Sequence, residues 1–339
     1  MKGALLVNLG SPKSTSVKDV KNYLDEFLMD KRVIDTPYLL RAFLVKGIIL
    51  NTRPKKSAEA YKKIWWEEGS PLIVLSERLH KKVQNNTTTP VELAMRYGNP
   101  SLENGIKKLV EKGVTEIFLI PLYPQFAMAT TETIVVLAKK ISKNKYPNLK
   151  ITNLPAFYNN PNYIEVLSNS IQKELVKTNP EHLLFSYHGV PERHIKKSDI
   201  TKSHCKIDGS CCNTSSVAHE FCYRHQCYET TKLVAEKLKL PNNFYSTSFQ
   251  SRLGRDPWLQ PYTDLTIDDF PKNNIKKLAV VTPAFVSDCL ETLEEIGMEA
   301  KHSFIENGGE HFTTIPCLND NDEWANTLST WINNWSKKN

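Results

Sequence analysis

The stretch LLFSYHGVP at residues 183–191 shows the pattern on which the fold prediction rests. A short apolar run ends in His188, and Gly189 and Pro191 then turn the backbone sharply. A run of this kind, bounded by turn residues, is typical of a strand buried within a sheet. His188 therefore ends a predicted strand, where it is a candidate base or metal ligand; the alternative is a cap that hydrogen-bonds the backbone of the strand.

Similar short runs recur on both sides of this stretch, and segments with apolar residues at helical spacing separate them. Strands that alternate with helices predict a doubly wound α/β fold with parallel sheets. Four strands followed by four more predict two lobes, at residues 1–157 and 158–320, and a last helix at residues 321–339 that packs back on them. The eight predicted strands lie at residues 4–9, 91–97, 116–122, 151–154, 183–188, 244–249, 278–282 and 312–315.

Polar or turn-forming groups lie at the ends of six of the predicted strands or directly after them. These groups begin at Gly10, Arg96, Tyr123, Tyr187, Gln250 and Thr282. In parallel α/β sheets, ligands bind beyond the carboxyl ends of the strands. Two lobes facing each other would enclose a cleft lined by these groups, so the sequence predicts one shared ligand site.

The composition sets limits on the class of protein. The 339 residues include 44 basic and 37 acidic side chains, and no nucleic-acid-binding motif is present. Neither a signal peptide nor a run of about 18 apolar residues occurs, so we expect a cytoplasmic protein. The most apolar segment, residues 38–50, is interrupted by Arg41 and Lys46. A core helix or a pocket lip is favoured there over an interfacial helix, which would give peripheral membrane contact.

The segment TPAFVSDCLETLEEIGME at residues 282–299 carries a row of acids: Asp288, Glu291, Glu295 and Glu299. A helix that begins at residue 287 or 288 would place all four on one face. Like charges at this spacing destabilise a helix by about 0.2–0.5 kcal/mol per pair. The row is therefore either a solvated acidic face or a path that moves cations or protons, since carboxylates suit hard and borderline divalent metals.

Five of the seven cysteines lie between residues 205 and 227, with the spacing C-x5-C-C-x9-C-x4-C. An odd total without an export signal argues against a disulfide framework. The segment has few apolar residues, and its spacing matches neither a zinc ribbon nor a ferredoxin. Four thiolates holding a [2Fe–2S] cluster, a zinc ion and unligated thiols are the three alternatives.

Seven sequence blocks, in order along nearly the whole chain, resemble the ferrochelatase family. They are NLGSP (8–12), EGSPL (68–72), MRYGNPS (95–101), PLYPQF (121–126), SYHGVPERH (186–194), SFQSRLGRDPWLQPYTD (248–264) and TPAFVSDCLETLEEI (282–296). The resemblance implies two Rossmann-like lobes, each a four-stranded parallel sheet flanked by helices, that enclose a porphyrin cleft. Some bacterial members are similar in carrying an internal cysteine segment that holds a [2Fe–2S] cluster. Here that insert spans about residues 200–227, and its expected ligands are Cys205, Cys211, Cys212 and Cys222, with Cys227 as the spare.

The resemblance also implies roles for single residues. His188 matches the active-site histidine that abstracts protons, and Glu291 matches the acid opposite it, so both are expected at the substrate iron. Asp288 and Glu295 match an acidic path for protons or metal. Cys289 stands where some members have a second histidine, which argues against an iron route through it. The expected porphyrin contacts are Ser11, Arg96, Tyr123 and Phe249, and Lys31 and Arg32 are further candidates for the propionates.

The activity implied by the resemblance is insertion of Fe²⁺ into protoporphyrin IX, which forms protohaem and releases two protons. Coproporphyrin III is the runner-up substrate. A haem or tetrapyrrole carrier, or an iron–sulfur sensor on the same scaffold, is an alternative from another class. The intact pair His188 and Glu291 argues against that alternative.

Overall fold

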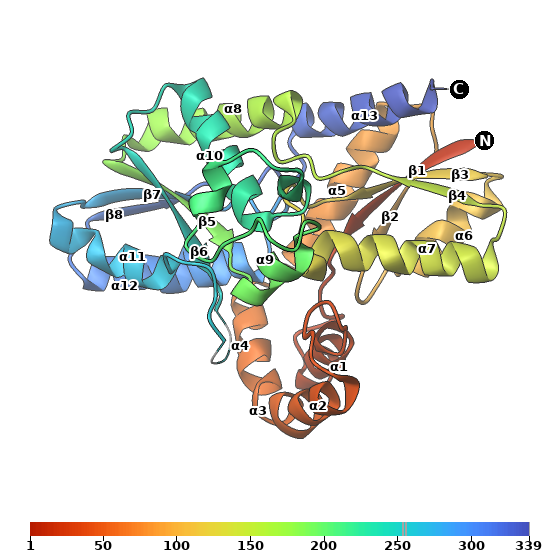
Figure 1. The fold of residues 1–339 in the computed structure, drawn as a ribbon, viewed down its shortest axis with the longest axis horizontal. Coiled ribbons are helices and arrows are strands. Elements are labelled where there is room, and N and C mark those ends of the chain that lie inside the picture. The colour runs from red at the N-terminus through yellow and green to blue at the C-terminus, as the bar shows by residue number, and fades with distance from the viewer. Residues whose placement is uncertain (253, 255, 339) are drawn as a thin grey trace. The chain divides into compact units, whose positions relative to one another are not determined.

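The computed structural model describes residues 1–252, 254 and 256–338, and the chain divides into two compact units (Figure 1). Unit 1 comprises Met1–Leu122, Met128–Pro155 and the chain from Asn319 onward. Unit 2 comprises Tyr123–Ala127 and Ala156–Leu318. Each unit holds one four-stranded sheet, and every strand pairing in both sheets is parallel.

The sheet of unit 1 has the strand order β2-β1-β3-β4. Its strands are β1 (Lys2–Asn8), β2 (Val91–Met95), β3 (Glu116–Pro121) and β4 (Lys150–Asn153). The central strand β1 is almost wholly apolar and buried, and its Leu6 pairs with Leu93 and Ile120. Helices α5 (Pro71–Asn85) and α13 (Asp322–Ser336) pack together on one side of this sheet, and α6 (Leu102–Glu111) and α7 (Thr133–Lys145) lie on the other (Figure 1).

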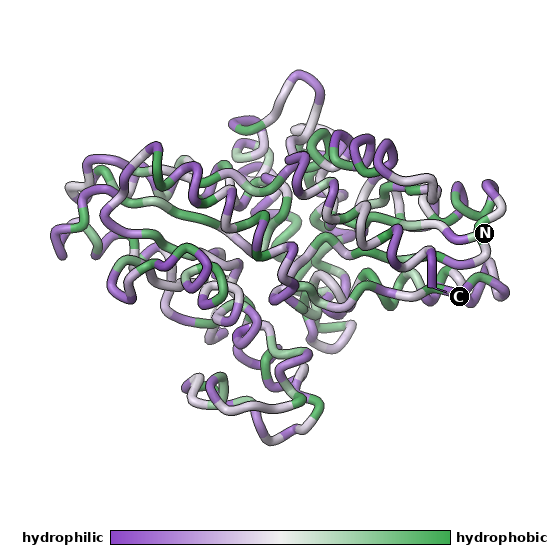
Figure 2. The backbone as a smooth tube through the Cα atoms, turned by 90° about the horizontal axis from the view of Figure 1, so that it is seen from above, coloured by the Kyte–Doolittle hydropathy of each residue, from purple (hydrophilic) through white to green (hydrophobic). Residues whose placement is uncertain are grey.

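The remaining helices of unit 1 lie between β1 and α5 in the sequence, except η2, which precedes α7. They are α1 (Val17–Leu28), α2 (Tyr38–Ala42), the π-helix η1 (Phe43–Ile49), α3 (Leu50–Thr52), α4 (Pro54–Ile64) and the π-helix η2 (Met128–Glu132). Hydrophilic and hydrophobic residues alternate along the coiled segments in Figure 2, as expected of helices that bury one face.

The sheet of unit 2 repeats the topology, with the order β6-β5-β7-β8. Its strands are β5 (His182–His188), β6 (Tyr245–Gln250), β7 (Lys277–Val281) and β8 (His311–Thr314). Helices α8 (Pro161–Thr178) and α10 (Tyr223–Leu238) cover one face, and α11 (Thr263–Asp269), α12 (Lys301–Glu306) and the π-helix η6 (Glu291–Ala300) cover the other. Short helices complete the unit: α9 (Glu192–Ser198), η3 (Ser210–Asn213), η4 (Val217–Glu220) and η5 (Pro271–Asn273).

All eight predicted strands are confirmed, and their ends differ from the predicted ones by no more than two residues. The predicted parallel α/β class is likewise confirmed. Helix α10 begins at Tyr223, so Cys227 lies within the helix.

The predicted α-helix across residues 288–299 is wrong in start and type. The helix that carries the acids is a π-helix, with i→i+5 hydrogen bonds, and it begins at Glu291. Asp288 lies in the turn before it, because Thr292 donates to the Asp288 carboxylate at 2.8 Å and accepts from the Cys289 N–H at 3.0 Å. These side-chain bonds compete with regular helical bonds and hold the turn in place.

Among the described residues, we find no helix whose length and apolar content would let it cross a bilayer. The apolar segment at residues 38–50 forms α2 and η1, and several of its large apolar side chains are exposed to solvent, Leu39 by 81%. Only Val45 and Leu50 of its apolar side chains are buried, in a small cluster with Leu28. A pure core role for this segment is therefore wrong.

Candidate active site

His188 ends strand β5, and its ring is held in one orientation by its own turn. The Nδ1 atom lies 2.7 Å from the carbonyl oxygen of Gly189, which can only accept, so Nδ1 carries the hydrogen. This bond leaves Nε2 with a free lone pair in the neutral ring, the form that a general base requires. The backbone carbonyl of Gln250 accepts from the Gly189 N–H at 2.7 Å and thereby holds this turn.

Close packing explains why Gly189 follows the histidine. A Cβ atom at this position would lie 2.9 Å from the Gln250 carbonyl oxygen and 3.1 Å from the Trp258 ring. Trp258 and Phe285 flank the imidazole, with ring centroids 6.4 Å and 6.1 Å from it. The half-buried imidazole therefore lies among aromatic rings, with limited room to turn.

Glu295 is the carboxylate that the structure links to His188. Burial raises the pKa of Glu295, and Glu291 raises it further, while a hydrogen bond from Ser251 and the charge of His188 oppose the rise. These opposing effects place His188 and Glu291 each within electrostatic reach of Glu295. A carboxylate with a raised pKa next to an imidazole is a candidate proton acceptor or donor.

Gln250 connects this carboxylate to both neighbouring elements. Its side-chain NH₂ donates to the Glu291 carbonyl oxygen at 3.0 Å and lies 3.5 Å from the Glu295 carboxylate. Its side-chain oxygen accepts from Ser186 at 2.9 Å. Gln250 is buried at the end of strand β6. Its bond to the Glu291 carbonyl therefore holds the first residue of η6 against that strand.

A cavity of about 350 Å³ opens beside these groups within unit 2. Phe249, Ser251, Glu295 and Glu299 are among its lining residues. Two acids on one wall of a cavity provide oxygen ligands for a divalent cation or acceptors for protons.

Asp288 has a different environment from Glu295. Its carboxylate accepts from Thr292 at 2.8 Å and from the Cys317 N–H at 3.4 Å, and the side chain is buried. Burial and the charge of Asp288 raise the pKa of the Cys317 thiol. Asp288 therefore lies against a neutral thiol, and its hydrogen-bond partners differ from those of Glu295.

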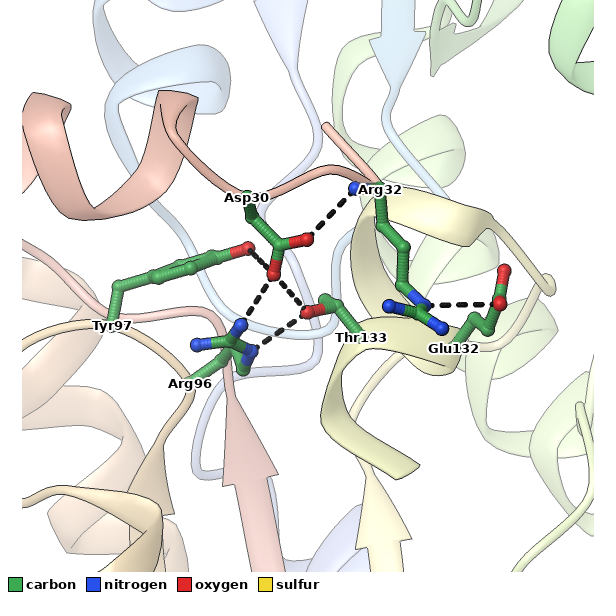
Figure 3. A network of polar contacts seen from close by, with 6 residues as sticks. All are labelled: Asp30, Arg32, Arg96, Tyr97, Glu132 and Thr133. Carbon is green, nitrogen blue, oxygen red and sulfur yellow. Dashed lines mark hydrogen bonds and ion pairs between the residues drawn. The ribbon is translucent and has the colours of Figure 1, made fainter. Parts of the chain in front are cut away.

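Arg96 belongs to a polar network in unit 1 (Figure 3). Its guanidinium pairs with Asp30 and donates to Thr133 at 2.7 Å, and Tyr97 donates to Asp30 at 3.1 Å. Burial raises the pKa of Asp30, but hydrogen bonds from Thr133 and the Arg32 N–H, with the charge of Arg96, outweigh it and lower the pKa.

A second cavity, of about 430 Å³, lies beside this network. Its lining includes the cations Lys31, Arg32, Arg96 and Lys140. Arg32 also pairs with Glu132 at 3.0 Å, as Figure 3 shows. The four cations outnumber the two acids, Glu26 and Asp30, among the lining residues, so the cavity suits an anionic ligand group.

The other three predicted porphyrin contacts are buried. The Ser11 hydroxyl has no hydrogen-bond partner among the described residues, although it is inaccessible to solvent. Tyr123 is 7% exposed, and Phe249 packs against Tyr187 and Tyr228. A buried hydroxyl without a partner is unusual, and it offers a hydrogen bond to an atom of a bound ligand.

Four of the five clustered cysteines converge in space. Burial raises the pKa of the Cys205 thiol, on which the neighbouring Cys222, Cys211 and Cys212 also act, and Cys222 together with burial raises the pKa of the Cys212 thiol. Cys227 is fully buried within α10, where burial raises the pKa of its thiol. In the part of the chain that the structure describes, no three His, Cys, Asp or Glu side chains already have the geometry of a metal site.

Sequence reasoning placed the group that begins at Gln250 at the shared site but gave Gln250 and Ser251 no role, and it did not identify the flanking rings of Trp258 and Phe285. Gln250 ends strand β6 and Ser251 follows it, so their position at a strand end was the available signal. The pairing of Asp30 with Thr133, 103 residues apart in sequence, has no local signal at all.

Comparisons with known proteins agree with the observed fold. A family model described as "Ferrochelatase" matches residues 1–335. A protein of Pseudomonas fluorescens (strain Pf0-1) named ferrochelatase is 50% identical over 328 residues, which cover 96% of each chain. A ferrochelatase of Stutzerimonas stutzeri (strain A1501) is 48% identical over 326 residues, covering 96% of this chain and 95% of that one.

Two solved structures are similar in fold. SirB from Bacillus subtilis, with Fe³⁺, has a TM-score of 0.54 at 13% identity and covers 99% of this chain and 98% of its own. The sirohydrochlorin chelatase SirB from Bacillus subtilis subspecies spizizenii, in complex with cobalt, has a TM-score of 0.53 at 11% identity, with coverage of 97% and 93%. At these identities the likeness concerns the fold alone.

Proposed function

This chain belongs to the ferrochelatase family, and from that premise we propose which of its residues carry out the reaction. The chain is a metal chelatase of haem biosynthesis that inserts Fe²⁺ into a porphyrin. We propose that His188 is the catalytic base, that Glu291 is the acid at the iron and that Glu295 completes the group. The electrostatic coupling of Glu295 to both His188 and Glu291 supports this assignment most directly.

Metallation of a porphyrin requires two pyrrole N–H protons to leave as Fe²⁺ enters, so the charge balances. A neutral imidazole accepts one such proton near pH 7. The bond from Nδ1 to Gly189 reserves Nε2 for that step. Once His188 carries the proton, the neighbouring Glu295 carboxylate stabilises the imidazolium.

The second proton needs an acceptor, and the iron needs ligands. Glu291 provides a carboxylate at the first position of η6, and Glu295 lies one turn further along. Because burial raises the pKa of Glu295, this group binds a proton more readily than an ordinary glutamate. We propose that protons leave through Glu295 towards Glu299 at the cavity wall, and that Asp288 serves the metal or proton path from its own side.

We propose protoporphyrin IX as the porphyrin and Ser11, Arg96, Tyr123 and Phe249 as its contacts. The unpaired, buried Ser11 hydroxyl and the cation-lined cavity beside Arg96 support this choice. The two propionates of the porphyrin are anionic, and Lys31 and Arg32 at that cavity are their proposed partners. The lobes proposed for these tasks are residues 1–157 and 158–320, with the helix after residue 320 attached to the first.

We further propose a [2Fe–2S] cluster on Cys205, Cys211, Cys212 and Cys222. The influence of Cys211, Cys212 and Cys222 on the pKa of the Cys205 thiol supports this proposal, and thiolates are the ligands such clusters use. Cys227 is excluded because it is buried among the aromatic side chains of α10. Bound there, the cluster would supply a redox-active group and a covalent link that ties the insert together.

We propose a cytoplasmic protein that contacts a membrane surface through residues 38–50. Tyr38, Leu39 and Phe43 are 62%, 81% and 66% exposed, and large apolar side chains grouped in this way mark an interaction site. Lys46 on the same segment is exposed and suits anionic head groups.

The proposed reaction is tested by anaerobic iron insertion, followed by the absorbance of the product haem. We expect turnover with protoporphyrin IX and a lower kcat/KM with coproporphyrin III. The reverse order would replace the proposed substrate. Porphyrin binding without metallation of either would contradict the enzyme and favour a carrier.

A further inference from the structure

Three atoms of the cysteine-rich insert form a small triangle that neither iron insertion nor the proposed cluster uses. Its corners are Nε2 of His204, Nε2 of His219 and the carbonyl oxygen of Cys211. The His204 nitrogen lies 3.3 Å from the His219 nitrogen and 3.2 Å from the Cys211 oxygen. The third edge, from the His219 nitrogen to the Cys211 oxygen, is 3.3 Å.

Hydrogen bonds alone do not account for this triangle. The carbonyl oxygen only accepts, and each Nε2 atom carries either one hydrogen or one lone pair. If both nitrogens carry hydrogens, both donate to the two lone pairs of the oxygen, and the edge between the nitrogens has no hydrogen bond. If one nitrogen lacks its hydrogen, its lone pair faces the lone pairs of the oxygen, and that edge has none. At most two of the three edges are therefore hydrogen bonds. The two N···O edges, at 3.2 and 3.3 Å, are also longer than the separation of about 2.9–3.0 Å that is most common for an N–H···O bond.

A metal ion accounts for all three contacts at once. A tetrahedral ion with bonds of about 2.0–2.1 Å holds its ligand atoms about 3.3–3.4 Å apart. The three observed edges match that separation, so the atoms form one triangular face of such a site. The fourth position of the tetrahedron remains open for water, as in sites with three protein ligands.

The backbone of His204 and the ring of His219 are held in place by neighbours that do not themselves ligate. Asp199 accepts from the N–H groups of His204 and Cys205 at 2.9 and 2.8 Å, which fixes the loop before the triangle. The His219 ring stacks on His225, with centroids 3.5 Å apart and planes 10° apart. Restrained ligands lose little freedom on binding, which favours metal affinity.

We propose that His204, His219 and the Cys211 carbonyl form a mononuclear binding site for a borderline divalent transition metal such as Zn²⁺, Co²⁺ or Fe²⁺. Two imidazole nitrogens with one neutral oxygen suit this class and select against Mg²⁺ and Ca²⁺, which prefer oxygen ligands. Both rings are half-buried, so an ion reaches them from solvent. The site is separate from the four thiols, because it uses only the backbone of Cys211.

The test is equilibrium dialysis of the full-length, anaerobically purified protein against Zn²⁺, with bound zinc counted by elemental analysis. His204→Gln and His219→Gln keep a hydrogen-bonding amide but remove the imidazole. His302→Gln is the matched control, because His302 is a surface histidine paired with Glu306. A Cys205→Ser/Cys222→Ser double variant removes zinc binding that depends on the thiols.

We expect each of His204→Gln and His219→Gln to lose one zinc equivalent, and the His302 control to lose none. The double cysteine variant should keep that equivalent, and X-ray absorption at its zinc edge should show imidazole nitrogens at about 2.0–2.1 Å without sulfur in the shell. Equal zinc content in wild type and both histidine variants would overturn the proposal. So would an equivalent that disappears with the cysteines and is indifferent to the histidines.

Discussion

Removing the Ser251 hydroxyl is expected to shift the pH dependence of iron insertion. Ser251 donates to the Glu295 carboxylate and thereby stabilises its ionised form, which opposes the rise in pKa that burial causes. In Ser251→Ala that opposition is gone, so Glu295 stays protonated to a higher pH. Because a protonated Glu295 neither stabilises the His188 imidazolium nor accepts a proton, activity should fall at a higher pH than in wild type.

The size of the shift follows from the strength of the bond. A hydrogen bond to a charged group contributes about 1.5–3 kcal/mol, and 1.36 kcal/mol corresponds to one pH unit. Gln250, at 3.5 Å, remains as a weaker partner, so the lower end of that range applies. The acidic limb of the kcat profile should therefore move upward by about one pH unit.

The assay is anaerobic iron insertion measured from about pH 5 to 9, a range that spans the titration of a raised carboxyl group and a histidine. Ser251 has a positive φ of 67°, so Ser251→Gly serves as a second variant that relaxes the backbone and should show the same shift. Ser303→Ala is the matched control, since Ser303 donates to another carboxylate, Asp268. An acidic limb that stays in place in both folded Ser251 variants would refute the coupling of Glu295 to the reaction.

Asp30→Asn should lower the free energy of unfolding in urea by about 3 kcal/mol, because the partly buried Arg96 charge loses its partner. Since the folded pKa of Asp30 is lowered, this stability is present above pH about 3.9 and lost as pH falls through the folded pKa, so wild type and variant should converge in acid. Cys222→Ser should abolish the visible absorbance of the anaerobically purified protein, whereas Cys227→Ser should retain it; identical spectra would reject the proposed ligands. Leu39→Glu should weaken sedimentation with anionic phospholipid vesicles, and Val176→Glu, at another exposed apolar position, should not.

Much of the fold was predictable because its signals are local. Runs such as residues 183–188 need burial on both faces, and the intervening amphipathic segments supply the helices that cover them. Parallel pairing follows from the same alternation of elements, whereas the strand order within each sheet was not predicted. The start of η6 was not predictable in this way. It depends on Gln250, whose side chain bonds the Glu291 carbonyl across 41 residues, and on bonds between Asp288 and Thr292.

The candidate site shows the same division. His188 was identifiable as a candidate because it ends an apolar run directly before a turn, at the predicted ligand site. Its tautomer was not predictable, because that depends on the 2.7 Å contact to the Gly189 carbonyl. The triangle of His204, His219 and Cys211 was also not predicted. Cysteine spacing does not show where a backbone oxygen lies or how the insert folds.

The most direct test of His188 as the catalytic base is anaerobic metallation by His188→Ala, measured together with porphyrin affinity by fluorescence quenching. Removal of a general base should lower kcat by about 10²–10⁴-fold. We expect the porphyrin Kd to stay within a few-fold of wild type and added imidazole to restore part of the rate. Wild-type turnover in a folded His188→Ala protein would contradict the account.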